Sequence, residues 1–244
     1  MIIHTVYKPE ENFKYIKDWL DHHLAIGIEH FYLYDNRGSV GDHDNEIKDI
    51  RYNQYGTLNG SIEQAIEFEN TFIKEYPVTK ILWQPKNEKG ETVYSWANSV
   101  LDLSSKIKEG LCAFIDMDEF IIKKEEFFPS AIKQKKFRSR ADFDRVTDIT
   151  ETFDINTEKF SRKCILDMST LPEILYEKNW GFFNMHFMNI DLPYSKNYFN
   201  HYNHNEIAHK WLIENYKHFD ENWKEVSYEN LFYNIDKKDI GLMI

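Results

Sequence analysis

Residues 2–36 are IIHTVYKPEENFKYIKDWLDHHLAIGIEHFYLYDN, and this pattern predicts a strand, a helix and a second strand. Ile2–Tyr7 is short, apolar and rich in β-branched residues, as strands are. Pro9 and two acids follow, which is typical of the first turn of a helix. Gly27 is a typical helix end, and His30–Asn36 predicts the second strand. Between Pro9 and Gly27, the side chains of one helix face recur at Phe13, Ile16, Trp19, Leu20, His23, Leu24 and Ile26.

The same alternation continues through the first half of the chain. Val78–Gln84 predicts a third strand, and residues 91–108 predict a helix that ends at Gly110. Leu111–Asp116 predicts a fourth strand. Buried strands that alternate with helices favour an α/β fold with a mostly parallel central sheet flanked by helices. In such sheets, ligands bind at the carboxyl ends of the strands.

The second half is less regular. We expect strands at Lys163–Met168 and Gly181–Ile190, and helical or capping segments from Trp211 onward. The basic run KQKKFRSR (Lys133–Arg140) favours a solvated helix face or loop, and a contact with anionic lipid or acceptor is the alternative. Because the sequence has no repeat, low-complexity linker or clear boundary, we treat residues 1–244 as a single domain.

Composition limits the class of protein. The chain has 244 residues, 42% of them hydrophobic, and a formal net charge of −11. This acidity argues against nucleic-acid binding and against a strongly basic membrane surface. Cys112 and Cys164 lie in apolar runs and predict buried thiols in a reducing cytoplasm. The first residues lack a signal-peptide pattern, and no apolar run is long enough to cross a membrane. We therefore expect a cytoplasmic protein, with peripheral contact at the inner face of a membrane as an option.

Two of the predicted strands end in acids. Asp35 lies at the end of the second, and Asp116 and Asp118 at the end of the fourth, in LCAFIDMDEFII (Leu111–Ile122). Residues two apart in a strand face the same side, so Asp116 and Asp118 should point together. Their mutual repulsion is relieved by a hard divalent cation with oxygen ligands. The pattern alone leaves open a metal-free turn, in which the two aspartates cap backbone amides and Glu119 is solvated. In the metal-binding interpretation, Glu119 points away from the two aspartates, and we expect it to hold the loop or a neighbouring backbone amide.

Histidines offer a second, weaker set of candidate ligands. One of the three in HYNHNEIAHKW (His201, His204, His209) is a plausible addition to an aspartate-based metal site, and a separate zinc site is the less favoured alternative. His23 shares the apolar helix face, which predicts a core histidine with satisfied hydrogen bonds.

Two segments, Glu11–Ser39 and Ala113–Ile121, together resemble the family 92 glycosyltransferases, relatives of the family 2 enzymes. AFIDMDEFI (Ala113–Ile121) resembles that family's D-x-D-E-F strand end, and KCIL (Lys163–Leu166), His186 and the pair His201–Tyr202 resemble its weaker C-terminal markers. Glu11–Ser39 resembles the family's opening, with matches at Trp19, Leu20, His23, Gly27, Ile28, His30–Asn36 and Ser39.

The resemblance implies a GT-A fold, with a nucleotide-sugar-binding half (1–122) and an acceptor half (123–244). It also implies a bound divalent metal, Mn²⁺ or Mg²⁺, and a UDP-linked sugar donor. Carried over residue by residue, Asp35 would contact the base or ribose, Asp116 would lie near the ribose and metal, and Asp118 would ligate the metal.

The resemblance places further residues around the diphosphate. His201 would be another metal or diphosphate contact, and Lys163 and His186 would line the diphosphate or acceptor side. The chemistry expected is inverting transfer, in which a carboxylate takes the acceptor proton. The candidates for this base are Asp191 and, as rivals, Glu173 and Asp154.

The predicted function is metal-dependent hexosyl transfer to a glycan or glycolipid, as in polysaccharide biosynthesis. The family's W-x-x-F-G segment has no counterpart after Ile122. This departure motivates the alternative, a catalytically impaired module that binds a sugar nucleotide or glycan. A metal-dependent nucleotidyltransferase or phosphodiesterase would also use paired aspartates and is a third candidate.

Overall fold

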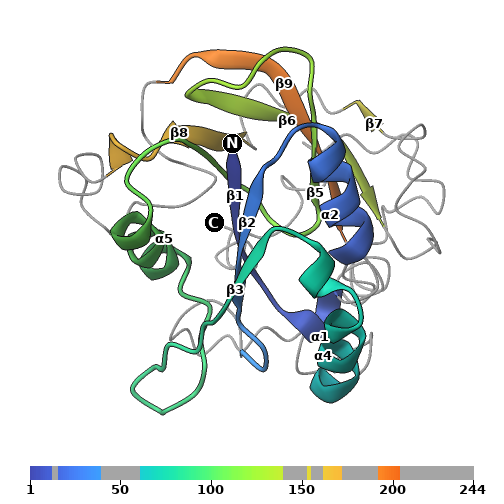
Figure 1. Ribbon diagram of the computed structural model, residues 1–244, viewed down its shortest axis with the longest axis vertical. Coiled ribbons are helices and arrows are strands. Elements are labelled where there is room, and N and C mark those ends of the chain that lie inside the picture. The colour runs from blue at the N-terminus through green and yellow to red at the C-terminus, as the bar shows by residue number, and fades with distance from the viewer. Residues whose placement is uncertain (13–15, 40–60, 140–152, 155–161, 172–191, 204–244) are drawn as a thin grey trace, which may run out of the picture.

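The computed structural model describes residues 1–12, 16–39, 61–139, 153–154, 162–171 and 192–203 (Figure 1). Helices and strands alternate through residue 114, and strands predominate among the described residues after it. In chain order the elements are β1 (Ile2–Tyr7), α1 (Pro9–Asn12), α2 (Ile16–Ala25), β2 (His30–Asp35), α4 (Ile62–Asn70), the short 3₁₀ helix η1 (Ile73–Glu75), β3 (Val78–Leu82), α5 (Trp96–Lys106), β4 (Leu111–Phe114), β5 (Glu119–Ile122), β6 (Ser130–Ser139), β7 (Phe153–Asp154), β8 (Arg162–Asp167) and β9 (Tyr194–Asn203).

The strands join in one sheet, in the order β3-β2-β1-β4-β8-β6-β9-β5, with β7 paired to β6 outside this path. The half formed by the early strands is parallel: β1 pairs with β2 and β4, and β2 pairs with β3. The other half is mixed, because β8 is antiparallel to β4 and β6, β9 is parallel to β6, and β5 is antiparallel to β9. The carboxyl ends of β1, β2, β3 and β4 therefore lie along one edge.

Helices cover both faces of the parallel half. Figure 1 shows α5 on one side of β1–β3, and α1, α2 and α4 on the other. The side chains of β1 alternate accordingly: Ile3 and Tyr7 join the core under α2, and Val6 joins the core under α5. Each face thus has its own apolar core, as expected for a sheet buried on both sides.

Local sequence explains where the helices begin and end. Ser61 caps α4, because its hydroxyl accepts the Gln64 backbone N–H while the Gln64 side chain accepts the Ser61 N–H. After α2, Gly27 adopts a φ of 96°, a left-handed conformation that favours glycine. The Ile28 N–H then donates to the His23 carbonyl at 3.0 Å. The chain thereby reverses directly into β2.

The structure confirms the α/β class and the four strands predicted in the first half, with ends that differ by at most two residues. The strand predicted at Lys163–Met168 is also confirmed, as β8. The interpretation of Lys133–Arg140 as a helix face or loop is wrong, since β6 runs through to Ser139 between β8 and β9. The strand predicted at Gly181–Ile190 lies outside the described residues.

In the described part of the chain, no helix combines the length and the apolar character needed to cross a membrane.

Candidate functional site

The acids identified in the sequence lie at the carboxyl ends of the two strands that flank β1. Asp35 ends β2 and pairs in register with Tyr7, and Asp116 comes two residues after β4. Because neighbouring strands are about 4.8 Å apart, β2 and β4 are about 10 Å apart across β1. The two acidic strand ends are therefore separate clusters on one edge of the sheet.

The segment Asp116–Glu119 forms a tight turn between β4 and β5. The Glu119 N–H donates to the Asp116 carbonyl at 3.1 Å, and the Asp116 N–H donates to the Glu119 carboxylate at 2.9 Å. Glu119 thus holds a backbone amide, as its sequence position suggested. Helix α2 fixes the turn from the other side, because the Trp19 indole N–H donates to the Glu119 carbonyl at 2.8 Å.

Two histidines of α2 bind the backbone of β5, the strand that follows the turn. His23 is fully buried, its Nδ1 lies 2.8 Å from the Trp19 carbonyl, and its Nε2 accepts the Ile121 N–H at 3.3 Å. His22 Nε2 donates to the Ile121 carbonyl at 2.8 Å. Burial lowers the pKa of both imidazoles, so they are neutral near pH 7. His23 is the core histidine that the sequence predicted.

Lys163 enters the acidic turn from β8, the antiparallel neighbour of β4. Its side chain is fully buried, and its ammonium lies 2.7 Å from Asp116 Oδ2 and 3.2 Å from Glu119 Oε1. Burial lowers the pKa of Lys163, but the charges of Asp116, Glu119 and Asp118 and the hydrogen bond to Asp116 together raise it by more, so the net shift is upward. Lys163 is therefore a permanent cation inside the turn.

Asp118 completes this group, which we call the β4 cluster: Asp116, Asp118, Glu119 and Lys163. The Asp118 side chain is close enough to Lys163 to raise its pKa further. Asp118 is 7% exposed and the Asp116 side chain 26% exposed, whereas Glu119 is fully buried. Among these described side chains, three carboxylates face one ammonium, which leaves a net charge of −2.

Strand β9 brings His201 to the same place. Its backbone pairs with Glu119 on β5 and with Phe137 on β6. The side chain of His201 lies outside the described part of the structure. The expected proximity of His201 to the aspartates is thus supported for the main chain.

The donor set of the β4 cluster fits a hard divalent cation that arrives with a phosphate ligand. In the described residues, no three His, Cys, Asp or Glu side chains gather around one point in the manner of a closed metal cage. Nucleotide-bound Mg²⁺ is usually held by one or two carboxylates together with substrate phosphates, and no such cage is needed. If such an ion binds here, Asp116 and Asp118 are the residues that would supply those oxygens.

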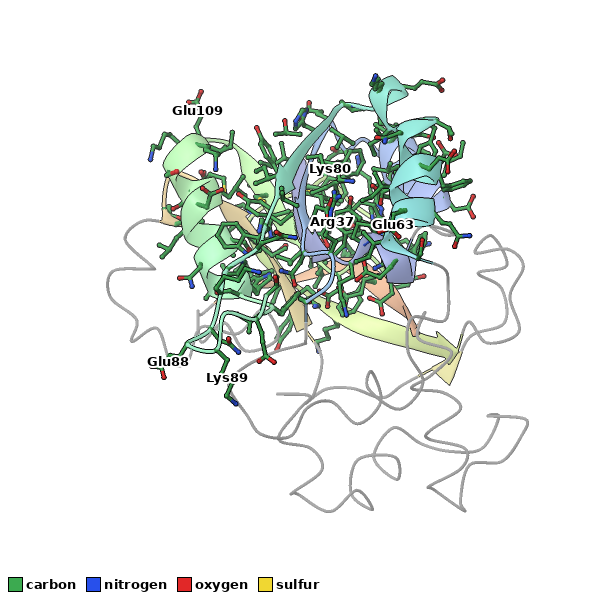
Figure 2. All side chains as sticks on the ribbon, turned by 90° about the horizontal axis from the view of Figure 1, so that it is seen from below. Arg37, Glu63, Lys80, Glu88, Lys89 and Glu109 are labelled. Carbon is green, nitrogen blue, oxygen red and sulfur yellow. The ribbon has the colours of Figure 1, made fainter. Side chains whose placement is uncertain are left out.

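The end of β2 carries a different group, which we call the β2 network: Asp35, Arg37, Glu69 and Lys80. Asp35 is fully buried and accepts from Arg37 Nε at 3.0 Å and 3.1 Å. Lys80 lies 3.1 Å from Asp35 and forms an ion pair with Glu69 on α4. Figure 2 shows Arg37 and Lys80 close to each other over the strands. The β2 network therefore contains two carboxylates and two cations in ion pairs with each other.

Tyr7 extends the β2 network toward β1. Its hydroxyl donates to Glu69 at 3.1 Å. Burial raises the pKa of Tyr7, and Glu69 and Asp35 raise it further. Burial also raises the pKa of Glu69, an effect that Lys80 only partly offsets. Both oxygens of Asp35 already accept from Arg37 or Lys80, so this carboxylate is held within the β2 network.

Sequence reasoning missed Arg37, Glu69 and Lys80. One signal was present: Lys80 interrupts the apolar pattern of the strand VTKIL, and a lysine that is largely removed from solvent usually has an ionic partner. The remaining candidates lie elsewhere. His186, Asp191 and Glu173 are outside the described residues, and of Asp154 only the backbone is described, where β7 pairs with β6.

Comparisons with protein-family models, with curated proteins and with solved structures find no significant match for this chain.

Proposed function

We propose that the protein is a glycosyltransferase that binds a nucleotide sugar along the carboxyl ends of β2, β1 and β4. The observation that supports this most is the β4 cluster, in which the turn after β4 brings the carboxylates of Asp116 and Asp118 to the carboxyl end of the parallel strands, around the ammonium of Lys163. The resemblance of Glu11–Ser39 and Ala113–Ile121 to one glycosyltransferase family points to the same chemistry.

The nucleotide fits the distance between the two acidic strand ends. A nucleoside diphosphate is long enough to span the roughly 10 Å between β2 and β4. We place the base and ribose near the end of β2, where Arg37 is oriented by Asp35, and the diphosphate at the β4 cluster. Asp116 and Asp118 would hold Mn²⁺ or Mg²⁺ there. When bound, such an ion neutralises the charge that develops on the leaving diphosphate.

The residues of the chain would then orient the reaction. Glu119 and Lys163 fix the turn, so that Asp116 and Asp118 keep their positions during the reaction. An acceptor hydroxyl attacks the anomeric carbon, the bond from that carbon to the diphosphate oxygen breaks, and the nucleoside diphosphate leaves. A carboxylate takes the hydroxyl proton, and Asp191 remains our candidate for this base. UDP as the nucleotide and a glycan or glycolipid as the acceptor belong to the same proposal.

A donor-hydrolysis assay tests the proposal. The protein is incubated with Mn²⁺ and a panel of UDP- and GDP-sugars, and the released nucleoside diphosphate is measured. We expect release from one donor and a loss of at least a hundredfold in Asp118→Asn, comparable to the loss of a main electrostatic group in an active site.

The matched control is Asp167→Asn. Asp167 ends β8 at the opposite edge of the sheet, opposite Leu111, and its carboxylate accepts from Ser169. This variant should keep the activity of the wild type. Nucleotide binding without hydrolysis or transfer would favour the binding-module alternative, and absence of nucleotide binding would contradict the proposal.

A further inference from the structure

Lys163 forms an ion pair with Asp116, which is one of the two carboxylates that the proposed cation would need. Its ammonium lies 2.7 Å from Asp116 Oδ2 and is itself fully buried. The ammonium also contacts Glu119, so it is held between two acids and does not extend to solvent. Any divalent cation that binds Asp116 must therefore share that carboxylate with a cation built into the fold.

This arrangement weakens cation binding while the nucleotide is absent. The ammonium repels a second cation at the turn, and no three His, Cys, Asp or Glu side chains of the described residues gather around one point as a closed metal cage. Phosphate oxygens of a bound nucleotide would add both ligands and negative charge. Cation and nucleotide should then bind more tightly together than either does alone.

We infer that Lys163 is a positioning residue that competes with the divalent cation for Asp116, so that the cation binds tightly only together with the nucleotide. This inference rests on the proposed function. Lys163 acts through Asp116 and Glu119, and not by direct contact with the diphosphate.

The inference is tested by measuring Mn²⁺ binding without nucleotide. The electron paramagnetic resonance signal of free Mn²⁺ is followed as Mn²⁺ is added to the wild type and to Lys163→Met, which keeps the side-chain length but removes the charge. We expect Mn²⁺ to bind Lys163→Met at least about tenfold more tightly, in the range by which outer partners of metal ligands alter affinity.

A second variant keeps the test valid if Lys163→Met does not fold. Lys163→Met/Glu119→Gln removes the buried ion pair as a whole, and the glutamine carbonyl can still accept the Asp116 N–H. The double variant should also bind Mn²⁺ more tightly than the wild type, by a smaller factor because one acid is lost. Unchanged or weaker Mn²⁺ binding in the folded Lys163 variants would overturn the inference.

Lys80→Met is the matched control, because Lys80 also joins two carboxylates, at the β2 network. This variant should bind Mn²⁺ as weakly as the wild type, and tight binding would overturn the inference. A parallel titration with UDP present separates the two hypotheses. Failure of the wild type to bind Mn²⁺ with UDP would contradict the proposed function, whereas tight Mn²⁺ binding by the wild type alone would contradict only the role of Lys163.

Discussion

Asp35 and Asp116 both lie at the carboxyl end of a parallel strand, but the described side chains around them differ in charge. In the β2 network, the carboxylates of Asp35 and Glu69 meet the cations of Arg37 and Lys80. In the β4 cluster, three carboxylates meet the ammonium of Lys163. By formal charge, the four members of the β2 network balance, whereas the four members of the β4 cluster sum to −2. We infer from this difference that the β2 network serves mainly stability, and we propose that the β4 cluster serves binding.

The largest expected effect on stability comes from Asp35→Ala. This change leaves Arg37 and Lys80 without a shared acceptor in a buried site, and breaking a buried pair costs about 3–5 kcal/mol. The free energy of unfolding is measured by urea denaturation, and Asp21→Ala, which removes an exposed acid paired with Lys17, is the control. A loss below about 1 kcal/mol would show that the β2 network does not stabilise the fold.

An intermediate effect, visible in the pH dependence, is expected for Glu69→Gln. Burial raises the pKa of Glu69 above its ordinary value of 4.5. As pH rises from 4.5 to the folded pKa, the unfolded chain loses this proton before the folded protein does. The wild type therefore loses stability over this window, and the variant does not. Denaturation at several pH values from 4 to 8 measures the difference, and parallel curves for both proteins would contradict the assignment.

The smallest effect on stability is expected for Asp118→Asn. The change removes one like charge from a cluster of net charge −2 and keeps an oxygen acceptor, so the free energy of unfolding should change by about 1 kcal/mol or less. Metal-dependent nucleotide binding should nevertheless be lost. A large loss of stability would mean that the β4 cluster, like the β2 network, serves mainly the fold.

The sequence predicted the parallel half of the sheet because its signals are local. Ile2–Tyr7 is a short segment rich in apolar and β-branched residues that coincides with β1, and Gly27 marks the turn after α2. The mixed half depends on contacts between distant segments. Strand β6 pairs with β8 and β9, and its run of lysines hides this in the sequence, because charge alone favours a solvated segment.

The sequence predicted the part of the candidate site that depends on local signals and missed the part that depends on contacts between distant segments. The spacing of Asp116 and Asp118 after an apolar strand located the β4 cluster, and the position of Glu119 suggested its bond to a backbone amide. The counter-charges could not be assigned, since Lys163 comes from β8 and Lys80 from the middle of β3. A lysine inside an apolar strand signals a buried ion pair, but the sequence does not name its partner.

Calorimetric titration of UDP into the wild type, once with Mn²⁺ and once with EDTA, tests the central claim most directly. The account predicts saturable binding with Mn²⁺ and binding at least tenfold weaker in EDTA, because the β4 cluster and the diphosphate are both negative and need a shared cation. Equal affinity in Mn²⁺ and EDTA, or no binding in either, would contradict it.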